Sequence, residues 1–285
     1  MQQVSELIDL LDLEALEVNL FRGSSRSVGS SRVFGGQVLA QSLAAALRTV
    51  PEGRHVHSLH GYFVLAGMVD RPIVFEVDRI RDGGSFTTRA VKAIQNGAAI
   101  FHLTASFQKS QEGYDHQSPM PQVAAPDSLI SYDDMAEKFG DQLPDNIRRM
   151  LNVKRPLEFK PVEFINPFKS ERMDPVRNVW LRAKGSMSDD RRHHELVLAY
   201  ASDYNLLTTA LLPHGKAINY SNLQVASLDH AMWFHRPFRI DEWLLYSIDS
   251  PSAGGARGFT RGSIYDTEGR LVASVTQEGL LRKKR

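Results

Sequence analysis

The segment from Gln37 to Leu47 is the feature that most restricts how this chain can fold. Its Ala, Leu and Val side chains cover almost the whole circumference of a helix. A helix that lies on a protein surface keeps one polar face, which this segment lacks. The segment therefore predicts a helix that other parts of the protein surround on nearly all sides.

Runs with the composition of β-strands follow this segment. Asp82-Gly83-Gly84 and Asn96-Gly97 separate the last three of them, and such residues are the strongest short signal for a hairpin. The first half of the chain is therefore expected to wrap an antiparallel sheet around a helix. The expected elements are an amphipathic helix over residues 5–19, a short strand over 20–22, and strands over His57–Leu65, Ile73–Arg81, Phe86–Gln95 and Ala99–Gln108.

The second half repeats the order of the first. Glu268-Gly269 occupies the place of Asn96-Gly97, and Thr260-Arg261 precedes the second turn as Thr88-Arg89 precedes the first. An internal duplication explains this match best. The expected fold class is α+β, with two repeats that each wrap an antiparallel sheet around a long helix. The expected elements are strands over 162–164 and 179–184, a helix over His194–Leu212, and strands over 225–235, 243–250, 257–265 and 271–280.

The region between the two patterned halves has a different character. Gln, Ser, Pro and Ala dominate residues 109–125, and a modest helical pattern covers 130–150, as is typical of a linker with a short helix of its own. We expect an N-terminal repeat over 1–110, a linker over 111–155, and a C-terminal repeat over 156–285 that carries the catalytic residues.

The overall composition excludes several classes of protein. The 34 Lys and Arg residues almost balance the 33 Asp and Glu residues, for a net charge of +1, which argues against a nucleic-acid binder. The chain has no cysteine, and this excludes a thiolate nucleophile and cysteine-ligated metals. No apolar run approaches the ~20 residues of a membrane span, and acids interrupt the N-terminal apolar stretch, unlike in a signal peptide. We expect a cytoplasmic protein.

No motif points to a metal or a bound cofactor. His60 faces away from His55 and His57 along one expected strand, and His193 and His194 diverge on a helix. The sequence contains no phosphate-binding loop, dinucleotide fingerprint, zinc-protease motif or serine-nucleophile elbow. We expect the protein to use neither a metal nor a cofactor.

Polar residues interrupt apolar faces in the second half. Asp203 continues the apolar stripe of the helix over 194–212, and a buried carboxylate needs partners or a purpose. Strand alternation places Gln277 on the inward face of its strand, and it places Ser227 inward beside Val225. These three side chains are expected to converge. A satisfied structural network is the alternative explanation at this point.

The first half lacks this polar set. The helix over Gln37–Leu47 contains no acidic residue, and the aligned turns place Ala105 opposite Gln277. Alternation does place His57 on the inward face with Leu59. His57 is therefore a candidate additional site residue, although a core histidine bonded to a carbonyl is the more frequent outcome.

Several long motifs resemble the acyl-CoA thioesterase II family. The resemblance covers essentially the whole chain, and it implies a tandem (double) hotdog fold, which agrees with the inferred duplication. The motifs are Val33-Phe34-Gly35-Gly36-Gln37, Tyr200-Ala201-Ser202-Asp203, the string from Leu228 to Pro237 and Val275-Thr276-Gln277-Glu278-Gly279.

The resemblance also implies roles for residues. Asp203, Ser227 and Gln277 fall on the family's triad, which binds and activates a water that attacks a thioester carbonyl; some members carry Thr in place of Ser227. The implied substrate is an acyl-CoA, and the implied assembly is a homodimer or homotetramer. Backbone N–H groups near Gly35-Gly36 or at a helix start are the expected donors to the oxyanion.

Two other functions stay open from the sequence. A hotdog enzyme that hydrates enoyl-CoA uses the same fold, but the Asp and His pair that such enzymes show near the helix start is not evident here. A non-catalytic acyl-CoA-binding protein is the other alternative. Retention of all three triad positions argues against it.

Overall fold

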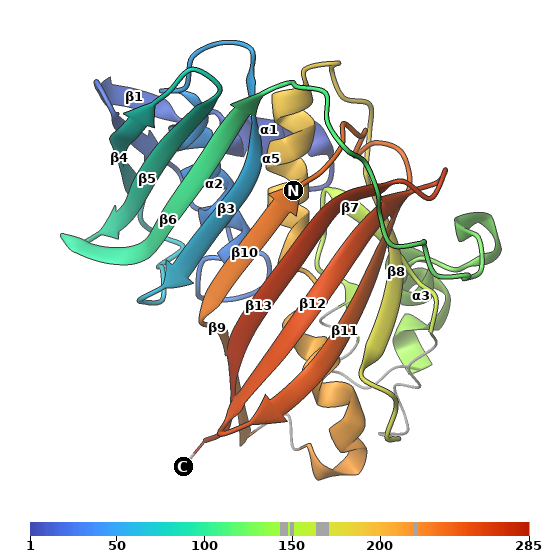
Figure 1. Ribbon diagram of the computed structural model, residues 1–285. Coiled ribbons are helices and arrows are strands. Elements are labelled where there is room, and N and C mark those ends of the chain that lie inside the picture. The colour runs from blue at the N-terminus through green and yellow to red at the C-terminus, as the bar shows by residue number, and fades with distance from the viewer. Residues whose placement is uncertain (143–147, 149–150, 164–170, 219–221, 285) are drawn as a thin grey trace.

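One continuous antiparallel sheet runs through both halves of the chain (Figure 1), in a computed structural model that describes residues 1–142, 148, 151–163, 171–218 and 222–284. Its order is β1-β2-β4-β5-β6-β3-β10-β13-β12-β11-β8-β7, and β9 also pairs with β13. The strands are β1 (Glu14–Glu17), β2 (Leu20–Gly23), β3 (Arg54–Phe63), β4 (Ile73–Asp82), β5 (Phe86–Gln95), β6 (Ala98–Lys109), β7 (Leu157–Pro161), β8 (Val176–Ala183), β9 (Leu223–Ser227), β10 (Asp229–Phe234), β11 (Leu244–Gly254), β12 (Arg257–Asp266) and β13 (Leu271–Lys283).

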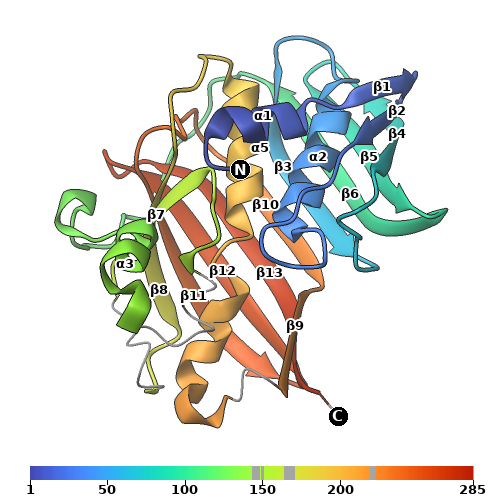
Figure 2. The same ribbon diagram turned by 180° about the vertical axis from the view of Figure 1, so that it is seen from behind.

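Two long helices, one from each half, lie side by side behind the sheet (Figures 1 and 2). The predicted α+β fold with two sheet-wrapped helices is therefore confirmed. The α-helices are α1 (Val4–Leu11), α2 (Gly35–Leu47), α3 (Tyr132–Phe139) and α5 (Arg191–Ser202), and the short 3₁₀ segments are η1 (Pro126–Ser128), η2 (Gly140–Gln142) and η3 (Leu207–Ala217). None of the helices in the described part of the chain is long and apolar enough to cross a membrane.

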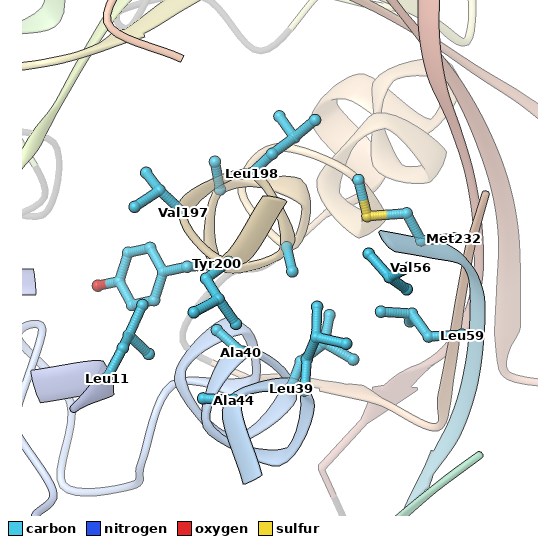
Figure 3. Close-up of a cluster of buried hydrophobic side chains, with 14 of the residues drawn as sticks. Leu11, Leu39, Ala40, Ala44, Val56, Leu59, Val197, Leu198, Tyr200 and Met232 are labelled. Carbon is cyan, nitrogen blue, oxygen red and sulfur yellow. The ribbon is translucent and has the colours of Figure 1, made fainter. Parts of the chain in front are cut away.

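The strands β3 and β10 join the two halves of the sheet. They pair in antiparallel fashion, with Leu59 opposite Met232. The side chains of Leu59 and Met232 point toward the two helices, where they meet Leu39 and Leu198 (Figure 3). All four side chains are completely buried, so the core is continuous across the junction between the halves.

Helix α2 is enclosed, as its composition predicts. Every residue from Gly36 to Leu47 is buried, and the Ala and Leu residues among them are strong helix formers. A Cβ atom at Gly36 would collide with the carbonyl oxygen of Tyr200 in α5. Glycine at this position therefore allows the start of α2 to approach the last turn of α5, and this approach positions the site described below.

Helix α5 is shorter than its apolar pattern predicts. The expected helix over 194–212 ends at Ser202, and a separate 3₁₀ segment, η3, starts at Leu207. Asn205 adopts a left-handed conformation with φ 64°, which Asn tolerates better than most residues. The hydroxyls of Thr208 and Thr209 donate to the Asn205 carbonyl. The left-handed Asn205 therefore separates α5 from η3, and the two hydroxyls satisfy its carbonyl.

Three other predicted elements differ from the structure. The N-terminal helix ends at Leu11 rather than continuing to residue 19, and the residues beyond it form the β1–β2 hairpin. The strand predicted over 225–235 is broken at Leu228 into β9 and β10. The strand predicted over 162–164 forms earlier, as β7, and residue 164 lies outside the described residues. Part of the linker helix predicted over 130–150 also lies outside them.

Candidate active site

Asp203 lies where the end of one long helix meets the start of the other. It directly follows α5, and the Gly36 N–H in the first turn of α2 donates to its Oδ2 at 2.9 Å. A Cβ atom at Gly35 would lie only 2.7 Å from the same oxygen. The N-terminus of a helix carries a partial positive charge. The first half of the chain thus stabilises a carboxylate that belongs to the second half.

The other carboxylate oxygen of Asp203 accepts hydrogen bonds from the second half. Gln277 Nε2 on β13 donates to Asp203 Oδ1 at 3.1 Å, and Ser227 Oγ lies 3.4 Å from the same oxygen. The Gln277 amide also donates to Ser227 Oγ. The structure therefore brings together the three residues that the sequence singles out, from a helix end and two paired strands.

Ser227 reaches this position for a different reason from the one we predicted. Val225, two residues earlier on the same strand, is 40% exposed, so the predicted apolar inward face is wrong at Val225. Ser227 is instead the last residue of β9, where it pairs with Gly279 of β13. The strand is interrupted at Leu228 before β10 begins, and the Ser227 hydroxyl faces Asp203 at this strand end.

The environment of Asp203 changes its acidity. Burial raises the pKa of Asp203 from 3.8 to about 6, and the hydrogen bonds from Gln277, Gly36 and Ser227 oppose this rise. A raised pKa means that the folded protein binds the proton more tightly than the unfolded chain does. Above about pH 6 the group is a carboxylate with basicity suited to general-base catalysis.

Aromatic side chains form the apolar surroundings of this carboxylate. The Phe34 ring lies 4.5 Å from the Tyr204 ring and 5.1 Å from the Tyr200 ring, centroid to centroid. Phe63 lies within 3.1 Å of the Cβ position of Gly35. These rings desolvate the carboxylate, whereas the Asp203 residue as a whole stays partly exposed.

His57 does not join this cluster. Its Nε2 lies 2.7 Å from Ser106 Oγ on β6, and its ring packs against Phe86. The pairing register between β3 and β6 shifts at this point, and both Val56 and Leu59 are buried. A bulge of this kind adds one residue to the alternation. The predicted inward orientation of His57 is therefore wrong, and the side chain lies on the opposite face of the sheet from Leu59.

The role of Gly36 is the part of the site that sequence reasoning missed. We expected a backbone N–H near Gly35-Gly36 to face an oxyanion, but the Gly36 N–H instead donates to the carboxylate of Asp203. The glycine pair in the Val33–Gln37 motif was the available signal.

In the described part of the chain, no group of three or more His, Asp and Glu side chains has the geometry to hold a metal ion.

Two family models match this chain. The model described as acyl-CoA thioesterase matches residues 148–280, and the model described as acyl-CoA thioesterase N-terminal domain matches residues 22–108. Among curated relatives, acyl-CoA thioesterase 2 of Haemophilus influenzae is 39% identical over 98% of both chains. Acyl-coenzyme A thioesterase 8 of Homo sapiens is 41% identical, over 96% of this chain and 88% of its own length.

Solved structures give the same result. An acyl-CoA thioesterase II from Mycobacterium marinum superposes with a TM-score of 0.79 at 44% identity, over 96% of this chain and 97% of that chain. A hotdog protein from Alicyclobacillus acidocaldarius superposes with a TM-score of 0.78 at 19% identity, over 98% and 99% of the two chains, and this supports the fold alone. The chain thus belongs to the acyl-CoA thioesterase II family and is a thioester hydrolase.

Proposed function

We propose that the protein hydrolyses acyl-CoA thioesters to a free fatty acid and CoA, using a water activated by Asp203, Ser227 and Gln277. The observation that carries this proposal is the shared oxygen of Asp203. Its Oδ1 contacts both the serine hydroxyl and the glutamine amide, and the residue is partly exposed within apolar surroundings. A water bound at this place has a base beside it and two polar groups that can hold it.

The first step is attack by water. Asp203 accepts one proton while the water oxygen forms a bond to the thioester carbonyl carbon, and the carbonyl electrons move to oxygen. General-base action of this kind contributes roughly 10²–10⁴-fold to the rate. Ser227 and Gln277 hold the water, so that attack starts from a fixed geometry. The N-terminus of α2 adds a positive helix end near the negative charge that develops.

The second step is loss of the thiol. The tetrahedral intermediate collapses, the carbon–sulfur bond breaks, and the CoA thiolate leaves with the bonding electrons. The proton held by Asp203 passes to the sulfur, which restores the carboxylate. A thiolate leaves readily, so no acyl group needs to be attached to the protein. The aromatic residues Phe34, Phe63 and Tyr204 support an apolar place for the acyl chain beside the reacting carbon.

The test is the activity of Asp203→Asn, measured as release of free CoA thiol with a thiol-reactive dye. The chain has no cysteine, so the enzyme itself gives no background. We expect a loss of roughly 10²–10⁴-fold. Asp229→Asn is the matched control, because Asp229 is a second partly buried carboxylate that accepts a hydrogen bond from the Glu278 N–H on β13, and it should keep its activity. Full activity in Asp203→Asn would exclude the mechanism.

We further propose that the protein is a homodimer or homotetramer located in the cytoplasm. The resemblance to the family supports this assembly, and the absence of cysteine fits a reducing compartment. Light scattering coupled to size-exclusion chromatography gives the number of chains per particle, and a single-chain mass would contradict the proposed assembly. Fractionation of the source cells followed by immunodetection tests the compartment.

A further inference from the structure

Two buried polar atoms behind the triad have no hydrogen-bond partner among the described residues. They are Oε1 of Gln277 and Nδ1 of His230. Gln277 is 1% exposed and His230 is fully buried, so solvent does not satisfy either atom. An unpaired polar atom in a protein interior is costly. Strand β10 pairs with β13, with Ala231 opposite Thr276, so the next residues along the two strands, His230 and Gln277, are neighbours. Two unpaired atoms on neighbouring buried residues suggest that they serve one another.

The other ring nitrogen of His230 does have a neighbour. Its Nε2 lies 2.9 Å from Ser202 Oγ, and the Ser202 hydroxyl donates to the Ala199 carbonyl oxygen at 2.8 Å. Burial lowers the pKa of His230 to about 4, although the adjacent Gln277 side chain opposes this shift. The ring is therefore neutral near pH 7 and carries a single proton, on one nitrogen or the other.

The requirements of Asp203 decide which nitrogen is protonated. The carboxylate can only accept hydrogen bonds, so the Gln277 amide must turn its NH₂ group toward Asp203, as the structure has it. This leaves Gln277 Oε1 on the His230 side, where only a donor satisfies it. A proton on Nδ1 is that donor, and the Ser202 hydroxyl then turns its one proton from the Ala199 carbonyl to Nε2. In this arrangement the side chains of Gln277, His230 and Ser202 are all hydrogen-bonded, and the Ala199 carbonyl gives up its side-chain donor.

We propose that His230 is a positioning residue for the hydrolysis, holding the Gln277 amide in its productive orientation through an Nδ1–H···Oε1 hydrogen bond, with Ser202 fixing the ring tautomer. This inference rests on the proposed role of the triad. With the proton on Nε2 instead, the Gln277 amide rotates to satisfy Nδ1, and its oxygen then faces the carboxylate. The water then loses the Gln277 amide as one of the two groups that hold it, while the substrate site keeps its shape.

The first experiment compares two replacements of His230. His230→Phe removes the donor, and we expect kcat to fall about 10- to 100-fold with KM almost unchanged. His230→Asn keeps an N–H close to the position of Nδ1 and should recover most of kcat. The control is His194→Asn, which removes another buried histidine of the same core, bonded to Ser188 O and Ile240 N. It should lower stability without lowering kcat per folded molecule.

The second experiment reads the tautomer of His230 in the wild-type protein. Long-range ¹⁵N–¹H correlation spectra of the wild-type protein report the tautomer of each histidine, and the signals missing from His230→Asn identify His230. We expect an Nδ1–H tautomer in the wild type. We also expect that Ser202→Ala shifts the ring toward Nε2–H and lowers kcat in parallel.

The outcomes separate this inference from the proposed mechanism. An Nε2–H tautomer in the wild type overturns the positioning role, as does full kcat in folded His230→Phe. If Asp203→Asn is inactive in those cases, the triad stands and only the role of His230 fails. If Asp203→Asn is fully active, the mechanism itself fails, and the positioning role fails with it.

Discussion

The same place in the two halves of this protein holds two different polar arrangements. In the second half, strand pairing sets Thr260 of β12 opposite Gln277 of β13. In the first half, the corresponding pair is Arg89 of β5 opposite Ala105 of β6. Each pair lies under the end of its long helix. The pair in the second half contains the Gln277 amide, which donates to a carboxylate. The pair in the first half contains the buried guanidinium of Arg89.

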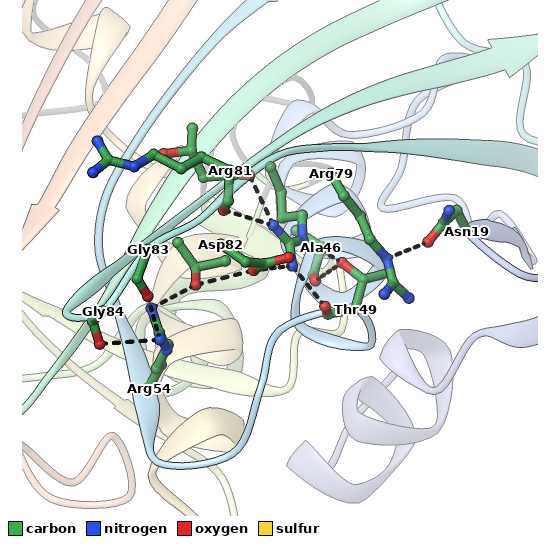
Figure 4. Close-up of polar contacts among 12 residues, drawn as sticks. Asn19, Ala46, Thr49, Arg54, Arg79, Arg81, Asp82, Gly83 and Gly84 are labelled. Carbon is green, nitrogen blue, oxygen red and sulfur yellow. Dashed lines mark hydrogen bonds and ion pairs between the residues drawn. The ribbon is translucent and has the colours of Figure 1, made fainter.

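The arginine of the first half uses all of its donors within the chain. Arg89 is fully buried. Its guanidinium donates to both the hydroxyl and the carbonyl of Thr49, to the carbonyls of Arg81 and Thr88, and to Asp82 at 2.6 Å. Figure 4 shows these partners Thr49, Arg81 and Asp82 close together. Because the guanidinium has no donor left for a ligand, its role is to stabilise the fold.

The second half differs because its polar groups keep free capacity. Asp203 is partly exposed, and its carboxylate accepts three hydrogen bonds, which leaves room for a fourth. Equivalent positions of a duplicated fold can therefore become structural or chemical. The criterion is whether the buried polar groups satisfy one another completely or leave an accessible group unsatisfied.

The largest expected effect concerns Asp203. Besides its loss of activity, Asp203→Asn should be more stable than the wild type at pH 8. The pKa of Asp203 is about 6 in the folded protein and 3.8 ordinarily, so the wild type loses stability as the pH rises through this interval. Urea unfolding at pH 8 tests this. If the variant is clearly less stable than the wild type, Asp203 has a mainly structural role, as Arg89 does.

The next effect is the reverse case, in the first half. Arg89→Met removes the donors for several buried carbonyls at nearly constant volume, and it should cost roughly 2 to 5 kcal/mol in the free energy of unfolding. The value of kcat per folded molecule should not change, because Arg89 touches none of the triad. A fall in kcat that exceeds the fall in the folded fraction would show that the two halves are coupled.

The pH dependence should also distinguish the halves. Below about pH 6, kcat/KM should fall tenfold per pH unit as Asp203 becomes protonated. The hydrogen bond from Arg89 lowers the pKa of Asp82, so Asp82 contributes stability that is lost only as the pH falls through that lowered pKa. Activity should therefore decline on acidification before this contribution to stability does. A profile that stays flat down to pH 4.5 contradicts the assignment of Asp203 as the base.

The smallest effect should come from Ser227. Ser227→Thr keeps the hydroxyl and should change kcat only a few-fold, whereas Ser227→Ala removes one of the two groups that hold the water and should lower kcat about tenfold. Steady-state kinetics with one acyl-CoA substrate measures both variants. Equal kcat values for the Ala and Thr variants would show that the hydroxyl is not used.

Much of this architecture could be predicted from the sequence, because apolar periodicity reports burial directly. The enclosed helix and the inward position of Gln277 follow from such patterns. The errors at His57 and in the alignment of Arg89 have different causes. A bulge in β3 between Val56 and Ser58 shifts the alternation at His57 by one residue, and no composition signals it. The β12–β13 turn is longer than the β5–β6 turn, so aligning the glycines of the two turns matches Arg89 with Arg261, whereas strand pairing matches Arg89 with Thr260.

Because β3 pairs with β10, the sheet cannot be completed until the ribosome has synthesised β10. Met232 follows its partner Leu59 by 173 residues along the chain. At synthesis rates of about 5–20 residues per second, the free edge of β3 waits roughly 10 to 35 s for its partner strand. During that interval the nascent first half presents an unpaired edge, which is a template for wrong pairing with another chain. Slow translation should therefore harm the yield of this protein more than its final stability suggests.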